Sequence, residues 1–155
     1  MEKKRKYYKG KFRPDQPDKY KGNTRNIIYR SMWERRFMIY LDRNENIIEW
    51  GSEELSIPYK SPVDGKIHRY FPDFYVKVKQ YDHTVKEYLV EIKPKNQVTP
   101  PKKNPKRRTK SWHYAIREWG KNQAKWESAT HYCQKHNMEF KVLTENDLGL
   151  NNPYK

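Results

Sequence analysis

Two stretches of this 155-residue chain decide its fold: Tyr70-Phe71-Pro72-Asp73-Phe74-Tyr75-Val76 and Tyr88-Leu89-Val90-Glu91-Ile92-Lys93. Both are rich in aromatic and branched residues, which predicts β-strands. Because strand side chains alternate between faces, Glu91 and Lys93 point one way and Ile92 the other. If the two strands pair, Asp73 joins Glu91 and Lys93 at one edge of the sheet. Two acids and one base placed in this way are suited to a hard divalent cation and an activated water.

The pattern alone is weak, because Pro-Asp and Glu-x-Lys each occur three times in a chain with 34% charged residues. Only Asp73 and the Glu91/Lys93 pair lie in consecutive apolar strands joined by a turn of hairpin length. The alternative is a cross-strand ion pair on a solvated face of the sheet, which contributes about 1 kcal/mol at most.

The remaining pattern predicts a small α/β domain around a mixed sheet, in the order α-β-β-β-α-β. Residues 31–42 are expected to form a helix, and Asp64-Gly65 is the signal of a hairpin between runs 55–59 and 67–78. Further strands are expected at 87–93 and 138–143. Apolar residues at helical spacing predict a helix over about 111–136, which Gly120 could break. Its tryptophans are interpreted as core, and Gln123 as a residue at the core edge or a support for the site.

Glu34 lies on the apolar stripe of the first expected helix, together with Phe37, Met38 and Leu41. An acid in that position costs free energy unless it is paired, hydrogen-bonded or near a cation. One explanation is a capping box, in which Glu34 accepts a hydrogen bond from the Ser31 amide. The other is a role at the active site, and the two are compatible.

The net charge of +15 is unevenly distributed. Residues 1–30 carry 11 lysines and arginines against 3 acids, and residues 94–111 carry 7 with no acid. Solvated segments that keep the protein soluble are one interpretation. A polyanion partner, most commonly nucleic acid, is favoured, because both segments flank the candidate site. The single cysteine, Cys133, excludes an internal disulfide, and neither a signal peptide nor a membrane span is apparent.

Glu34, Asp73, Glu91 and Lys93, in this order and followed by a helix, resemble the motif of PD-(D/E)XK nucleases. Within that superfamily the chain is most similar to the head completion nucleases of T-even-type phages and to the nuclease subunit of heteromeric transposases. Six ordered blocks spanning about residues 26–148 carry the similarity: Ser31-x-x-Glu34-x-x-Phe37, Ile57-Pro58-Tyr59, Arg69-Tyr70-x-Pro72-Asp73-Phe74, Glu91-Ile92-Lys93-Pro94, Tyr132-Cys133 and Glu139-Phe140-x-Val142-Leu143-Thr144-Glu145.

The resemblance implies a restriction-endonuclease-like core and a division of roles. Asp73, Glu91 and the Ile92 backbone carbonyl would bind Mg²⁺, with Mn²⁺ as an alternative. Glu34 would complete the metal shell directly or through water, and Lys93 would orient or help to deprotonate the attacking water. The expected domain is 26–150, with a basic flexible arm at 1–25, a Pro/Lys-rich insertion at 95–111 and a tail at 151–155.

The function that follows is a metal-dependent DNA endonuclease of phage head completion, which contacts DNA phosphates with little sequence specificity. Phage head or portal proteins are expected partners, a membrane is not, and the expected location is the virion and the host cytoplasm. The alternatives are a non-catalytic DNA-binding virion protein and a transposase-type or junction-cleaving nuclease. The insertion at 95–111 would grip DNA or dock a capsid partner. The residues assigned to DNA are Lys3, Lys4, Arg5, Lys6, Lys95, Lys102, Lys103, Lys106, Arg107, Arg108 and Lys110.

Overall fold

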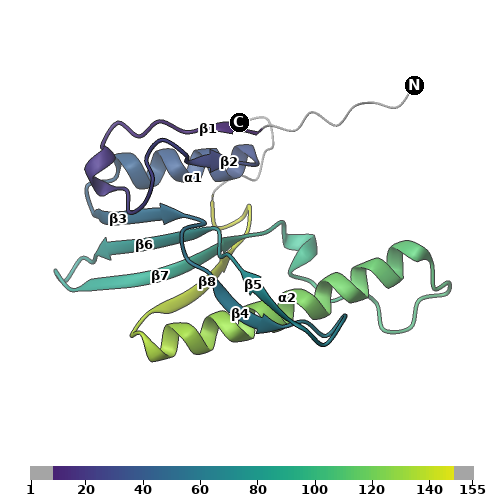
Figure 1. The fold of residues 1–155 in the computed structure, drawn as a ribbon. Coiled ribbons are helices and arrows are strands. Elements are labelled where there is room, and N and C mark those ends of the chain that lie inside the picture. Colours follow the sequence, from purple (N-terminus) through teal and green to yellow (C-terminus); the bar gives the residue numbers. More distant parts are fainter. Residues whose placement is uncertain (1–8, 149–155) are drawn as a thin grey trace, which may run out of the picture.

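The computed structural model describes residues 9–148, which form a mixed four-stranded sheet with a helix on each face (Figure 1). The strands lie in the order β3-β6-β7-β8, and only β7 and β8 are parallel. The strands of this sheet and its two helices follow the predicted order α-β-β-β-α-β along the chain, and four further strands of the described residues lie outside this sheet. The core elements are α1 (Met32–Arg43), β3 (Ile47–Ser52), β6 (Phe74–Lys79), β7 (Val85–Ile92), α2 (Lys110–Lys135) and β8 (Glu139–Leu143).

The two helices cover opposite faces because side chains alternate along β6 and β7. Phe74 and Val90 face the cluster that contains Phe37, Met38 and Leu41 of α1. On the other face, the fully buried Leu89 packs with Ala129 and Cys133 of α2. The stripe predicted for the first helix is therefore confirmed, and it places Glu34 at the sheet end where the motif residues lie.

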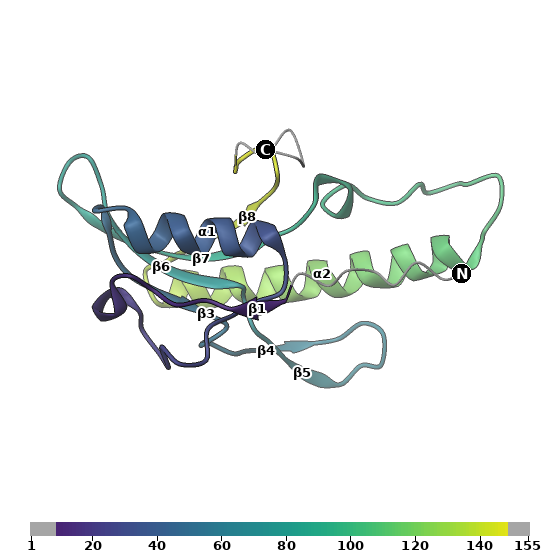
Figure 2. The ribbon, with the colours of Figure 1, turned by 90° about the horizontal axis from the view of Figure 1, so that it is seen from above.

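A hairpin, formed by β4 (Ile57–Lys60) and β5 (Ile67–Tyr70), extends from the sheet and packs against α2 (Figure 2). Gly65 occupies the left-handed region of its turn (φ 70°), as the Asp-Gly signal predicted. The strand expected over 67–78 is instead two strands, because the chain leaves the hairpin at Tyr70 and enters the main sheet at Phe74.

Two sequence-based expectations were wrong about the sheet and about α2. Strand β3 was missed, and it takes the edge position of the main sheet, whereas run 55–59 lies in the hairpin. Helix α2 continues without a break through Gly120, where the sequence allowed one. Gln123 is exposed, and the neighbouring Asn122 is buried in its place.

The segment expected to be a flexible arm is packed from residue 10 onward, and residues 1–8 lie outside the described part. Gly10–Lys11 (β1) pairs with Ile28–Tyr29 (β2), and Pro17–Lys19 forms a short 3-10 helix, η1. Phe12 and Tyr20 enter the core against Trp50, with ring centroids 5.8 and 4.7 Å away. The completely buried Asp42 accepts hydrogen bonds from two backbone amides of this segment at 2.8 and 3.0 Å. No helix within residues 9–148 is both long and apolar enough to cross a bilayer.

Candidate active site

Asp73 lies in the short connection between the hairpin and β6, directly beside the end of β7. Antiparallel pairing of Phe74 with Val90 fixes this position. The Asp73 carboxylate, through Oδ2, accepts a hydrogen bond from the Ile92 amide at 2.8 Å. This bond links Asp73 to Ile92, which lies between Glu91 and Lys93 in the sequence. The convergence of these segments, predicted from strand pairing, is thus present.

Glu91 is the most enclosed of the motif acids, with 6% of its surface exposed. Its Oε2 accepts a hydrogen bond of 2.6 Å from the Tyr70 hydroxyl, and Lys93 Nζ lies 3.8 Å from its Oε1. The Lys93 side chain is partly exposed at the same end of β7, so its ammonium group can reach solvent as well as Glu91. The acid is therefore held by one neutral donor and one cation.

Glu34 takes part in the helix cap and also faces the motif acids. The Ser31 hydroxyl accepts a hydrogen bond from the Glu34 amide at 3.1 Å, as a capping box requires. The Glu34 carboxylate, however, accepts from the Arg30 amide at 3.0 Å and not from Ser31, one residue away from the expected donor. Burial raises the pKa of Glu34, and the negative charges of Glu53 and Glu91 raise it further. The structure thus shows one of the two bonds of a capping box and places Glu34 near enough to Glu91 for their charges to interact, while its role at an active site stays a prediction.

Burial raises the pKa of both Asp73 and Glu91, and for Asp73 the neighbouring carboxylates raise it further. For Asp73, burial is the largest cause, followed by Glu91 and then Glu34, while the Ile92 amide and Lys93 act in the opposite direction. For Glu91, burial also dominates, and Tyr70 and Lys93 oppose it. Without a further cation, the site thus holds more negative charge than its surroundings neutralise.

This donor set fits a hard divalent cation. Mg²⁺ takes oxygen ligands, keeps several waters and is usually bound by one or two carboxylates. Within residues 9–148, no group of three or more His, Cys, Asp or Glu side chains could hold a metal ion by itself. A cation here would therefore use Asp73 and Glu91 together with water and main-chain oxygen, and Glu34 would act through water.

Sequence reasoning missed four neighbours of the site. Tyr70 supplies the hydroxyl to Glu91, and Lys125 of α2 lies over the Tyr70 ring, 5.6 Å from its centroid. Arg30 forms an ion pair with Glu53, which has a positive φ of 53° and donates its amide to the Asp73 carbonyl at 3.1 Å. Tyr70 lies in one of the quoted blocks, but only the packing of the hairpin shows that its hydroxyl reaches Glu91.

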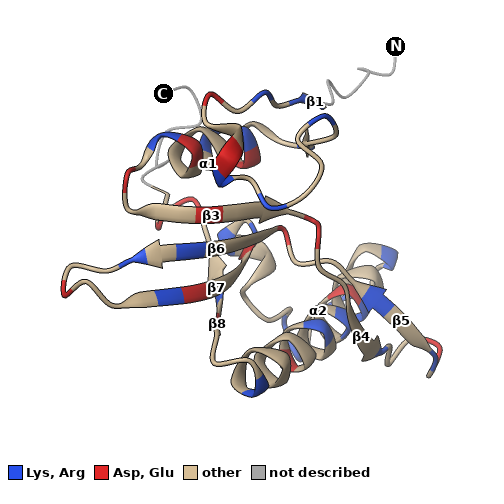
Figure 3. Ribbon diagram, turned by 60° about the vertical axis from the view of Figure 1, so that its left-hand side comes forward, with Lys and Arg blue, Asp and Glu red and all other residues tan. Residues whose placement is uncertain are grey.

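Most residues assigned to DNA that the structure describes lie on the long connection from β7 to α2, which extends beyond the sheet (Figures 1 and 2). Their side chains are exposed. Trp112 holds part of this loop: its indole NH donates to the Lys102 carbonyl at 2.8 Å, and Arg108 lies over its ring. Figure 3 shows basic residues at intervals along α2 as well. Lys3, Lys4, Arg5 and Lys6 lie outside the described residues.

The raised pKa values predict how pH affects the metal-free protein. The folded protein retains protons at Asp73 and Glu91 that the unfolded chain has released. The free energy of unfolding therefore falls as pH rises from about 4, the unfolded value, through the raised folded pKa. In EDTA, we expect Asp73→Asn to melt at a higher temperature than the unmodified protein at about pH 8, and the difference to shrink toward about pH 4.

Thermal denaturation across this pH range measures the effect. Asp18→Asn is the matched control, because Asp18 is exposed on η1. A difference between Asp73→Asn and the unmodified protein that grew toward acid pH would contradict a raised pKa.

Residues 44–145 match the family described as TnsA-like endonuclease N terminal. The chain is also 40% identical over 144 residues to the head completion nuclease of Enterobacteria phage T4, covering 91% of this chain and 93% of that protein. No solved structure matches. The family match includes Asp73, Glu91 and Lys93. Glu34 precedes that match but lies within the longer similarity, which spans 91% of the chain and so leaves too few residues outside it to exclude position 34.

Proposed function

Because the chain belongs to the TnsA-like endonuclease family, we propose that it is a Mg²⁺-dependent DNA endonuclease that acts in phage head completion. The observation that carries the proposal is the hydrogen bond from the Ile92 amide to Asp73, which holds this acid beside Glu91 and Lys93. Phosphodiester hydrolysis needs a stabilised negative charge at phosphorus and an oriented water. Two acids and one ammonium group at the end of a sheet supply both functions.

Each residue of the candidate site has a distinct role in the proposed reaction. Asp73 and Glu91 would hold the cation, which when bound acts as a Lewis acid and makes hydroxide accessible near neutral pH. The Ile92 amide fixes the Asp73 carboxylate, and the Tyr70 hydroxyl fixes that of Glu91. Lys93 would hold the attacking water or a phosphate oxygen by donating a hydrogen bond. Glu34 would orient a water between α1 and the two strands.

The coverage of the T4 relative favours head completion over a transposase role. The similarity spans 93% of that protein, whose name states a nuclease of head completion. We accordingly place this chain in the virion and the host cytoplasm, with head or portal proteins as partners. A transposase-type nuclease is the second candidate, since the matching family is described as TnsA-like. Dependence of cleavage on a partner protein or on branched DNA would favour that candidate.

The test is cleavage of supercoiled plasmid DNA by the purified protein. With Mg²⁺ or Mn²⁺ we expect nicked or linear products, and with EDTA in place of the metal we expect none. Cleavage of equal extent in EDTA would contradict a metal-dependent mechanism. DNA binding without cleavage in any divalent cation would instead favour a non-catalytic virion protein that retains the fold.

A further inference from the structure

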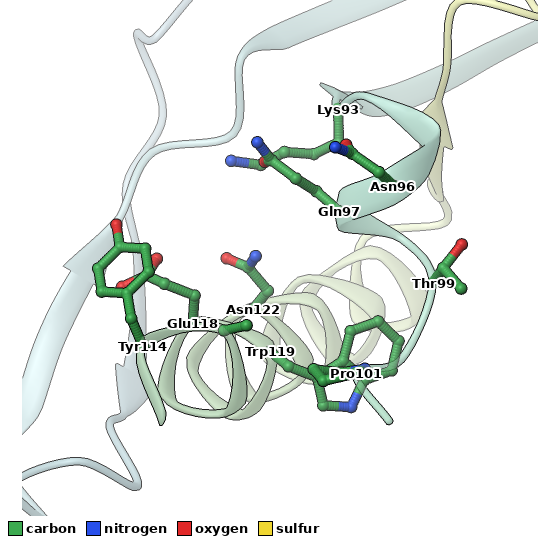
Figure 4. Close-up of a pocket in the computed structure, with 10 residues that line it drawn as sticks. Lys93, Asn96, Gln97, Thr99, Pro101, Tyr114, Glu118, Trp119 and Asn122 are labelled. Atoms are coloured by element: carbon green, nitrogen blue, oxygen red, sulfur yellow. The ribbon is translucent and has the colours of Figure 1, made fainter. Parts of the chain in front are cut away.

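A cavity of about 290 Å³ lies next to the candidate active site, between the segment that follows β7 and the N-terminal half of α2 (Figure 4). Lys93 forms part of its wall, so the cavity begins where the motif ends. Three side-chain amides line it: Asn96 and Gln97 of the 3-10 helix η2 (Lys95–Gln97), and Asn122 of α2. The volume is near the lower limit for small-molecule sites, which suits one compact group and excludes a duplex.

Asn122 is the observation that makes this cavity a binding site. Only 6% of its surface is exposed, and its amide points from α2 toward the space where Lys93 and Gln97 end (Figure 4). Among the described residues, the buried side-chain atoms without a hydrogen-bond partner are Trp50 Nε1 and Trp126 Nε1, so the Asn122 amide remains open to the cavity. Its donor and its acceptor are therefore available to a molecule in the cavity.

The lining identifies the chemical class of that ligand. An amide offers a donor and an acceptor side by side, which matches the edge of a nucleobase. Trp119 and Tyr114 add aromatic surface to the same cavity, and such surface favours a flat ring. Two charged residues also line the cavity, Lys93 and Glu118, and each has a partner of opposite charge: Glu91 at 3.8 Å and Lys121 at 3.0 Å. The wall therefore offers no unpaired charge to an ionic ligand. A neutral heteroaromatic ring meets all of these conditions.

We propose that the cavity binds one unpaired nucleobase of the DNA strand that is cleaved, adjacent to the phosphate held at Lys93. The proposal rests on the endonuclease function proposed above and adds the form of DNA that the site accepts. A base can reach the cavity only when it has left the stack, which costs least at single strands, frayed ends and mismatches. The site therefore selects DNA whose bases are unpaired beside the cleaved bond.

The α2 tryptophans were predicted to belong to the core, whereas Trp119 lines the cavity. Of the three, only Trp126 packs against a core cluster. The N-terminal half of α2 extends beyond the four-stranded sheet (Figure 2), so Trp119 lines a cavity and Trp112 contacts the loop instead of covering that sheet.

The experiment is a scan of single abasic sites through a labelled single-stranded oligonucleotide with a mapped cleavage position. We expect an abasic site at one position beside the cleaved bond to lower kcat/KM about 10-fold, and other abasic positions to have little effect. In Asn122→Leu, the unmodified oligonucleotide should be cut more slowly, and the abasic site should cause no additional loss. Gln123→Leu, which changes the exposed amide one position along α2, should keep the full response to the abasic site.

Two further measurements separate the pocket from the nuclease function. Fluorescence anisotropy with Ca²⁺ in place of Mg²⁺ repeats the abasic scan as a binding experiment, which works even if the protein never cleaves DNA. Gln97→Ala, on the exposed side of the cavity, repeats the test if circular dichroism shows that Asn122→Leu does not fold. Cleavage with equal kcat/KM on every abasic oligonucleotide would overturn the pocket while leaving the endonuclease function intact.

Discussion

Asp73→Asn is expected to lower the single-turnover rate of DNA cleavage by about 10³-fold or more, because the substitution removes a charge from the cation site. Asparagine retains an oxygen in the same position, so the hydrogen bond from the Ile92 amide can persist. The folded structure should therefore survive while the chemistry is lost.

Lys93→Met, which keeps the aliphatic stem, should lower the same rate by about 10²–10⁴-fold.

The measurement is the rate of plasmid nicking with saturating enzyme, compared with DNA affinity and melting temperature for each variant. Asp18→Asn and Lys79→Met are matched controls, since both positions are exposed and lie outside the site. We expect affinity to change much less than rate in the site variants. If Asp73→Asn cleaved at a rate within tenfold of the unmodified protein, Asp73 would not be a metal ligand.

The parts of the site that the sequence predicted are those encoded within short segments. Asp73 directly precedes β6, and Glu91 and Lys93 lie at the end of the adjacent strand β7, so strand pairing and alternation place them without knowledge of the rest of the fold. The Ser31 cap and the turn at Gly65 are likewise local, because each depends on a few consecutive residues.

The parts that the sequence did not predict depend on packing between distant segments. The hydroxyl of Tyr70 reaches Glu91 only because the hairpin packs against α2. Phe12 and Tyr20 stand among charged residues, which is typical of an arm, yet both pack edge-on against the Trp50 ring in the core.

Helix α2 shows a further reason for a wrong assignment. It carries large aromatic side chains on several faces, so an apolar stripe drawn through it can be wrong by one position, which is about 100° of rotation. That one position separates the exposed Gln123 from the buried Asn122. Only the contact of α2 with the sheet and the hairpin fixes the rotation of the helix.

The affinity for duplex DNA is expected to fall about 10³–10⁵-fold between about 50 and 200 mM salt, if the basic segments neutralise about 6–10 phosphates. The loop from β7 to α2 is the main described source of this charge, because its 7 lysines and arginines have no acid among them. Part of the basic charge in the N-terminal segment has structural contacts instead. Arg30 pairs with Glu53, and Lys19 donates to the carbonyls of Asp42 and Asn44.

A charge-matched pair of triple variants separates the loop from the rest of the surface. Changing Lys102, Lys103 and Lys106 to glutamine should reduce the slope of log affinity against log salt by about 3, since each phosphate contact contributes about 0.9. The control changes three exposed lysines at the opposite end of the sheet: Lys79, Lys86 and Lys135. The control variant has the same net charge as the loop variant. If only the total charge of the protein mattered, the two variants would therefore show the same salt slope.

Fluorescence anisotropy titrations at several salt concentrations give both slopes. If the loop binds DNA, the slope should be reduced in the loop variant and unchanged in the control variant. A nearly flat salt dependence of the unmodified protein would mean that the loop does not contact phosphates. Its lysines would then be available to an acidic protein surface, as expected if this segment docks a head or portal partner. In that case the triple loop variant should no longer bind that partner but should retain its affinity for DNA.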